Sequence, residues 1–134
     1  MAADMRGARM KLVQIAQRAV DLERATAFYS RLLGQEPAAR FDPPGLVFFD
    51  LGGVRLLLER GAPSALLYLE QPALAETVAR LEADGVRIIS GPQLVFTHPD
   101  ATLGPAGTEE WMAFIEDSEG NTVALVAHMQ PAGD

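Results

Sequence analysis

The chain has 134 residues, of which 49 % are hydrophobic and none is cysteine, and it carries a net charge of −7. That length and apolar content suit one domain with a hydrophobic core, while the lack of cysteine excludes disulfides, thiolate ligands and cysteine nucleophiles and fits a reducing, cytoplasmic location. The acidity opposes binding to nucleic acid, and no apolar run reaches the length of a membrane span, so we expect neither as a partner.

The first third of the chain predicts a tail, a strand and a helix. Residues 1–9 lack the apolar core of a secretory signal and are expected to form a flexible tail. Residues 11–19 predict a strand of apolar and small residues. Asp21 is a suitable N-cap for the helix that follows, and Gly34 is a suitable C-terminal stop.

A hairpin and a linker complete the first half. The strand at 46–51 is separated from the strand at 54–59 by Gly52 and Gly53, which predicts a tight turn between them. Residues 60–63 contain Gly and Pro and are the natural linker to the second half.

The second half repeats the order of the first half. It predicts one leading strand, one helix and three further strands, at 65–70, 73–84, 86–89, 110–115 and 122–127 in that order. Residues 97–108 form the longest stretch without periodicity. We expect this loop to be a mobile cover that brings His98 and Trp111 toward a cavity.

Several motifs recur in the order and spacing of a known group. They are the ten residues Val-Asp-Leu-Glu-Arg-Ala-Thr-Ala-Phe-Tyr at 20–29, the turn Phe-Asp-Leu-Gly-Gly at 49–53, and Trp-Met-Ala-Phe at 111–114 followed by Asp-Ser-Glu-Gly-Asn at 117–121. Over about residues 10–129 the chain resembles the vicinal oxygen chelate superfamily, which contains glyoxalases, bleomycin-resistance proteins and extradiol dioxygenases.

The resemblance implies an α+β fold. Two βαβββ modules, at about 10–60 and 64–129, would form a curved mixed sheet around a pocket in a single glyoxalase-like domain. Relatives commonly pair as homodimers, and exposed sheet edges favour the same arrangement here.

The resemblance also implies four positions for metal ligands, one on the first and one on the last strand of each module. Here they hold Gln14, Leu56 or Leu57, Leu66 and Ala124. Only Gln14 has an oxygen to offer, so we expect no metal in the superfamily site and no cofactor.

Three other residues are candidates for chemistry. Glu59 is the nearest substitute ligand on its strand, although a charge at a strand end is more often solvated. His98 is an ordinary loop residue or, above a pocket, an acid or base. His128 shares strand parity with Ala124, but its place near the C-terminus favours a solvent-exposed histidine.

The expected pocket is apolar with a few polar groups, which is the usual composition of a small-molecule site. Its expected ligand-binding residues are Gln14, Tyr68, Glu70, Trp111 and Thr122. Core packing is the alternative for Trp111.

These observations favour a metal-independent protein that binds a drug-like compound or a metabolite. The alternative is a lyase or isomerase of the same superfamily that acts on a small polar metabolite through Gln14, Glu59 or His98. A third alternative is a module that only dimerises or binds another protein.

Overall fold

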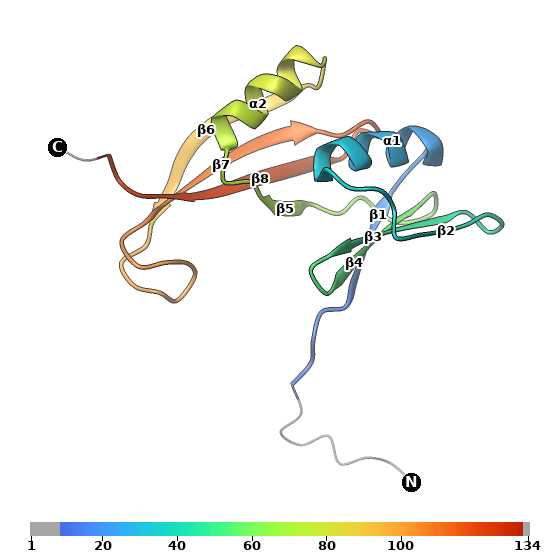
Figure 1. Ribbon diagram of the computed structural model, residues 1–134, viewed down its shortest axis with the longest axis horizontal. Helices are drawn as coiled ribbons and strands as arrows, with labels where there is room; N and C mark the ends of the chain where they lie inside the picture. Colours follow the sequence, from blue (N-terminus) through green and yellow to red (C-terminus); the bar gives the residue numbers. More distant parts are fainter. Residues whose placement is uncertain (1–8, 133–134) are drawn as a thin grey trace, which may run out of the picture.

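The computed structural model describes residues 9–132 and contains two four-stranded sheets, each with a helix on one side (Figure 1). The first module consists of β1 (Gln14–Arg18), α1 (Leu22–Leu33), β2 (Ala39–Phe41), β3 (Leu46–Leu51) and β4 (Val54–Glu59). The second consists of β5 (Leu67–Glu70), α2 (Leu74–Ala83), β6 (Ile88–Thr97), β7 (Glu109–Glu116) and β8 (Thr122–Met129).

Both sheets have the same topology. The strand orders are β1-β4-β3-β2 and β5-β8-β7-β6, and in each sheet the leading strand pairs parallel with the last strand while the other pairs are antiparallel. The predicted α+β fold with two βαβββ modules is therefore confirmed. The two sheets do not close on each other within one chain. In the described part of the chain, neither helix is long and apolar enough to cross a membrane.

Helix α1 begins and ends where the sequence predicts. The side chain of Asp21 accepts a hydrogen bond from the amide of Arg24, so it caps the helix N-terminus. Gly34 has φ 68°, a left-handed conformation that favours glycine and stops the helix.

Three strands differ from the prediction. Strand β2 was not predicted, β6 extends to Thr97 instead of ending near residue 89, and β8 continues through His128 to Met129. The pairing of β6 with β7 contains three register shifts, and consecutive residues of β6 are exposed on both faces. Such a strand has no alternating pattern by which the sequence could reveal it. The predicted tail, except for Arg9, lies outside the described residues.

One hydrophobic core lies between the helices and the sheets. On β8, Val123, Leu125 and Ala127 belong to this core. Side chains alternate along a strand, so Ala124 and its same-parity neighbours lie on the opposite face. We call that face of each sheet, away from the helices, the open face (Figure 1).

The turn at 117–121, which we call the docking turn, joins the second module to α1. Its Glu119 side chain is fully buried and accepts hydrogen bonds from the amide of Asp21 at 2.7 Å and from Nε of Arg24 at 2.8 Å. A carboxylate at this place also interacts favourably with the positive end of the helix dipole. The docking turn thus fixes the N-terminus of α1 to the second sheet.

Further polar contacts cross the same joint, among them a hydrogen bond of 2.8 Å from the Asn121 side chain to the carbonyl of Arg18. Tyr29, which is fully buried, donates its hydroxyl hydrogen to Asp117, and burial together with this hydrogen bond raises the pKa of Tyr29. The side chain of Gln17 donates to the carbonyl of Ala65 and accepts from the amide of Ala65, both at 2.8 Å. Buried polar groups of both modules therefore satisfy one another.

The Glu119 carboxylate should make stability depend on pH. Burial alone would raise its pKa, but hydrogen bonds from Arg24, Asp21 and Ser118 outweigh burial and bring the pKa to about 2, against an ordinary value of 4.5. As the pH falls from 4.5 toward 2, the unfolded chain takes up a proton that the folded protein does not, so the free energy of unfolding should decrease.

Glu119→Gln should therefore lower the free energy of unfolding by about 2 kcal/mol near pH 7, which is the contribution of hydrogen bonds to a charged group. This difference from the wild type should shrink as the pH approaches 2. Urea unfolding at several pH values measures it. The matched control is Glu116→Gln, which removes only an ion pair with the exposed Arg87 and should cost less than about 1 kcal/mol. Equal costs for the two variants at neutral pH would contradict the role given to Glu119.

Candidate functional site

Gln14, the one oxygen ligand expected at a superfamily metal position, is already engaged. It lies opposite Arg55 in the register of β1 and β4, and its Oε1 accepts a hydrogen bond of 2.9 Å from Arg55 Nε. The guanidinium of Arg55 also lies 5.9 Å from the centre of the Phe48 ring, a cation–π arrangement. The guanidinium of Arg55, a cation of the protein itself, therefore already binds this amide oxygen.

The Ala124 position is covered by aromatic side chains. In the second sheet Ala124 pairs with Tyr68 of β5 on one side and with Phe114 of β7 on the other. The rings of Tyr68 and Phe114 meet edge to face with centroids 6.5 Å apart, and Ala124 is completely buried. An apolar pair thus occupies the place where the resemblance puts a ligand.

The other two positions also hold apolar side chains. Leu56 is part of the core, Leu57 pairs with Ala16 on the open face, and Leu66 is exposed just before β5.

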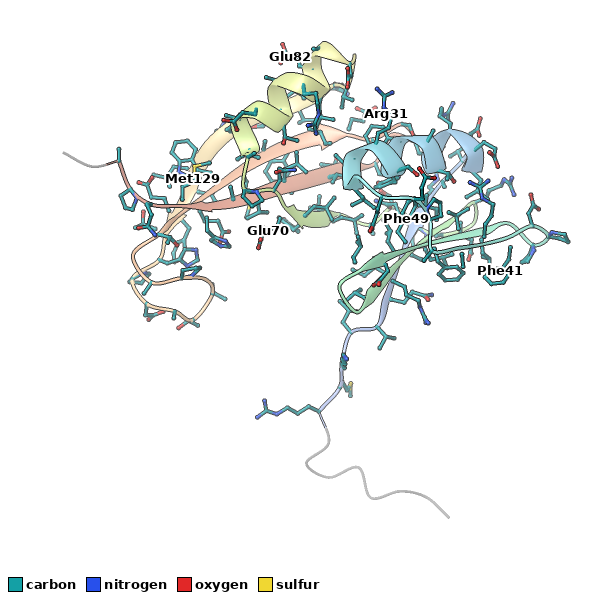
Figure 2. All side chains as sticks on the ribbon, in the orientation of Figure 1. Arg31, Phe41, Phe49, Glu70, Glu82 and Met129 are labelled. Carbon is teal, nitrogen blue, oxygen red and sulfur yellow. The ribbon has the colours of Figure 1, made fainter. Side chains whose placement is uncertain are left out.

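A cleft of about 710 Å³ lies between the two sheets and the C-terminal end of α1, and its apolar lining comes from the helix side of the sheets, including Ile15, Leu56 and Leu67. Tyr68 and Glu70 of β5 line it together with Arg55 of β4. Figure 2 shows Glu70 projecting from β5 away from the helices. Arg55 also lines a neighbouring cavity of about 450 Å³ with Gln14 and Phe48, so its side chain belongs to both cavities.

Two predicted ligand-binding residues lie elsewhere. Thr122 is exposed at the start of β8, opposite Glu116. Trp111 pairs with the core residue Ala127 and packs against the hydrophobic core. By strand parity Trp111 therefore faces the helix side of the sheet. This position corrects the expectation that the loop brings Trp111 toward the cavity.

Glu59 does not join Gln14. It pairs with Arg18 at the opposite end of the β1–β4 ladder, whereas Gln14 pairs with Arg55. Four residues of strand separate the two positions, about 13 Å. The two side chains are not placed to share one ion.

The two histidines, predicted as separate residues, form one cluster with Glu110. Oε1 of Glu110 lies 3.0 Å from Nε2 of His98 and 2.9 Å from Nε2 of His128. The side chain of His98 is 1 % exposed, and that of His128 is 25 % exposed. The expectations of an ordinary loop histidine and a solvent-exposed histidine are both corrected, because β8 extends far enough to place His128 opposite Glu110.

The shared strand parity of Ala124 and His128 was the sequence signal for this cluster. The sequence does not reveal Glu110 as the partner of the histidines. Glu110 lies opposite His128 because of the register of β7 against β8, and no local motif indicates that register.

Comparison with known proteins identifies the family. The model of the Glyoxalase/Bleomycin resistance protein/Dioxygenase superfamily matches residues 11–125. The chain belongs to this superfamily. No curated protein sequence matches it.

Solved structures of the superfamily share the fold. A lactoylglutathione lyase from Agrobacterium tumefaciens is 22 % identical with a TM-score of 0.62, and the match covers 90 % of this chain and 95 % of that one. A glyoxalase-related enzyme from Fulvimarina pelagi is 18 % identical with a TM-score of 0.66, covering 89 % and 88 %. A glyoxalase/bleomycin resistance protein/dioxygenase from Alicyclobacillus acidocaldarius is 17 % identical with a TM-score of 0.61, covering 88 % and 91 %.

Substitution of two glutamines of β1 tests which face of the first sheet each side chain occupies. Gln14→Ala should change the free energy of unfolding by less than about 0.5 kcal/mol, since it affects one exposed contact. Gln17→Ala removes the buried contacts to the Ala65 backbone and should cost about 2–3 kcal/mol. Denaturant unfolding of both variants measures the difference. A loss for Gln14→Ala as large as that for Gln17→Ala would place Gln14 in the core.

Proposed function

We propose that the protein binds a small organic molecule, drug-like or a metabolite, in the cleft between its two sheets, beside the open face, without a metal ion in the superfamily site. The observation that carries this proposal is the hydrogen bond from Arg55 to Gln14. A divalent ion on the Gln14 oxygen would lie within a few ångströms of a guanidinium, and because the ion carries two charges their repulsion would be about 8 kcal/mol at 4 Å near a protein surface. One amide oxygen does not offset that repulsion and the loss of the ion's hydration shell.

The side chains around the cleft support a ligand with both a planar apolar part and an oxygen-bearing group. Tyr68 and Phe48 offer ring surface, and aromatic rings stack well on planar molecules. Arg55 is exposed and lines both cavities, and its planar guanidinium suits carboxylate, phosphate or carbonyl oxygens.

Homodimerisation is part of this proposal. Tyr68, Leu66 and Phe41 are 56 %, 49 % and 52 % exposed, although all three are large apolar or aromatic residues. Large apolar side chains that remain exposed on a sheet are characteristic of an interface or a binding site. A second copy placed against the open face would cover these residues and enclose the cleft.

Ligand binding should persist without metal. Thermal-shift screening of small planar acids and drug-like compounds, followed by calorimetry of each hit with and without EDTA, tests this.

Substitutions at the cleft should weaken binding of a confirmed hit. The binding free energy should fall by about 0.5–1.5 kcal/mol, the net contribution of a hydrogen bond, in each of Gln14→Ala, Arg55→Ala and Tyr68→Phe. Arg87→Ala, which removes an exposed guanidinium elsewhere on the second module, should not weaken binding. Binding that disappears with EDTA and returns with added metal would contradict the proposal, and turnover of a hit would favour the lyase or isomerase alternative.

The protein should sediment as a dimer of the 14.4 kDa chain. Tyr68→Glu should increase the monomer fraction, because it places a charge on the surface that the second copy covers. Leu103→Glu, on the β6–β7 loop where Leu103 is 75 % exposed, is the matched control. Sedimentation equilibrium measures both, and a wild-type monomer at all concentrations would refute dimerisation.

A further inference from the structure

We propose that His98, Glu110 and His128 are the ligands of a divalent transition-metal ion, with Zn²⁺ the best-suited cation. Each residue offers one ligand atom, and these three atoms lie within 4.8 Å of one another. This site goes beyond the proposed function, because it requires neither an organic ligand nor the superfamily metal positions. His128 lies four residues beyond Ala124 on β8, about 13 Å along the strand.

The spacing of the ligand atoms fits a small ion. Around tetrahedral zinc, ligands at about 2.0–2.1 Å from the metal lie roughly 3.3 Å from each other. Glu110 Oε1 is 3.0 Å from Nε2 of His98 and 2.9 Å from Nε2 of His128. The three ligand atoms lie within 4.8 Å of one another, so an ion could bind once the two imidazole rings approach each other by at most about 1.5 Å, replacing the two hydrogen bonds by coordination.

The donor set selects the class of cation. Two imidazole nitrogens and one carboxylate oxygen suit zinc, nickel, copper or iron, whereas magnesium and calcium prefer sites made of oxygen alone. The side chains of Glu110 and His128 are 17 % and 25 % exposed. The cluster therefore retains a path to solvent, by which an ion could enter and which leaves a fourth coordination position for water or another ligand.

The backbone holds the three residues in place before any ion binds. Glu110 and His128 lie directly opposite each other in the β7–β8 ladder. His98 follows the end of β6, its amide donates to the carbonyl of Thr108 at 2.9 Å, and its carbonyl accepts from the amide of Gly107 at 2.8 Å. Both ends of the β6–β7 loop are thereby fastened beside the cluster.

The middle of the loop packs directly on the cluster. A Cβ atom at Gly104 would lie 2.9 Å from Cε1 of His98 and 3.0 Å from Nε2 of both histidines. Both distances are shorter than ordinary van der Waals contact, so only glycine leaves the two rings undisturbed. In Figure 1 this loop extends to the side of the sheets away from the helices. A bound ion would thus join the loop to β7 and β8.

Zinc titration of the untagged, EDTA-dialysed protein tests the proposal. Calorimetry should show one Zn²⁺ per chain, with Ni²⁺ competing and excess Mg²⁺ having no effect. His128→Ala and Glu110→Gln should each weaken Zn²⁺ binding at least tenfold, and Gly104→Ala should also weaken it. His128 is preferred to His98 for substitution, since His98 is buried and its loss endangers folding.

Two control variants should bind Zn²⁺ as the wild type does. Glu109→Gln removes the same charge from the neighbouring residue, whose carboxylate accepts from Trp111 on the other face of β7. Gln14→Ala alters the superfamily position, so it separates this site from that one. Melting temperatures of all variants without zinc confirm that they are folded.

Nitrogen NMR of the imidazole rings provides a second readout. Addition of Zn²⁺ should shift the Nε2 resonances of both histidines together, and Glu110→Gln should abolish that shift. Absence of zinc binding, or binding that His128→Ala and Glu110→Gln leave intact, would overturn the proposal. Neither result bears on the organic ligand of the cleft, which is measured in the presence of EDTA.

Discussion

The buried carboxylate of Glu119 is the contact on which the arrangement of the two modules depends. It is an isolated charge from the second module that becomes stable inside the protein only because the first module supplies Arg24 and the amide of Asp21. A buried charge without partners is costly, so the two modules cannot separate without exposing this group or leaving it unpaired. The same contact holds the start of α1, and α1 in turn covers the first sheet. The position of the sheets, and hence of the cleft between them, follows from this joint.

Strand parity then decides what each sheet presents. One face of β8 supplies the core, and the other carries Ala124, Val126 and His128 in a row. The cross-strand neighbours of these residues determine which end of the row is aromatic and which is polar. Tyr68 and Phe114 make one end aromatic, and Glu110 makes the other end polar. One strand therefore supports an apolar surface suited to an organic molecule and, farther along, a set of donors suited to a cation.

Much of the fold could be predicted from the sequence because its signals are local. Asp21 and Gly34 bound α1 through capping and a left-handed turn, and Gly52 with Gly53 bounds the β3–β4 hairpin. Strand β6 could not be predicted, because its irregular pairing removes the alternation on which the prediction depends. Its length is set by β7, whose paired residues lie 12 to 27 positions farther along the chain, so no local pattern reveals it.

The candidate site was predictable only in part, for the same reason. The lack of a donor atom at three of the four superfamily positions is a property of single residues and can be read directly from the sequence. The engagement of Gln14 by Arg55 and the meeting of His98 with His128 depend on which residues lie opposite one another in the sheets. Parity placed Tyr68 on the open face, but the placement of Trp111 required the register of β7 against β8.

The contact between Gln17 and Ala65 has a mechanical consequence. The side chain of Gln17 donates to the backbone carbonyl of Ala65 and accepts from its backbone N–H. It therefore makes the two hydrogen bonds that one peptide group of a neighbouring strand would make, although no strand pairing joins β1 to the segment before β5. A continuous ladder would hold the two sheets at one angle, because many hydrogen bonds would have to break together. Here side-chain bonds of Gln17, Glu119, Tyr29 and Asn121 connect the modules, so side chains rather than a backbone ladder set the angle between the sheets. A change in the width of the cleft would therefore strain these side-chain bonds and leave the backbone pairing within each sheet intact.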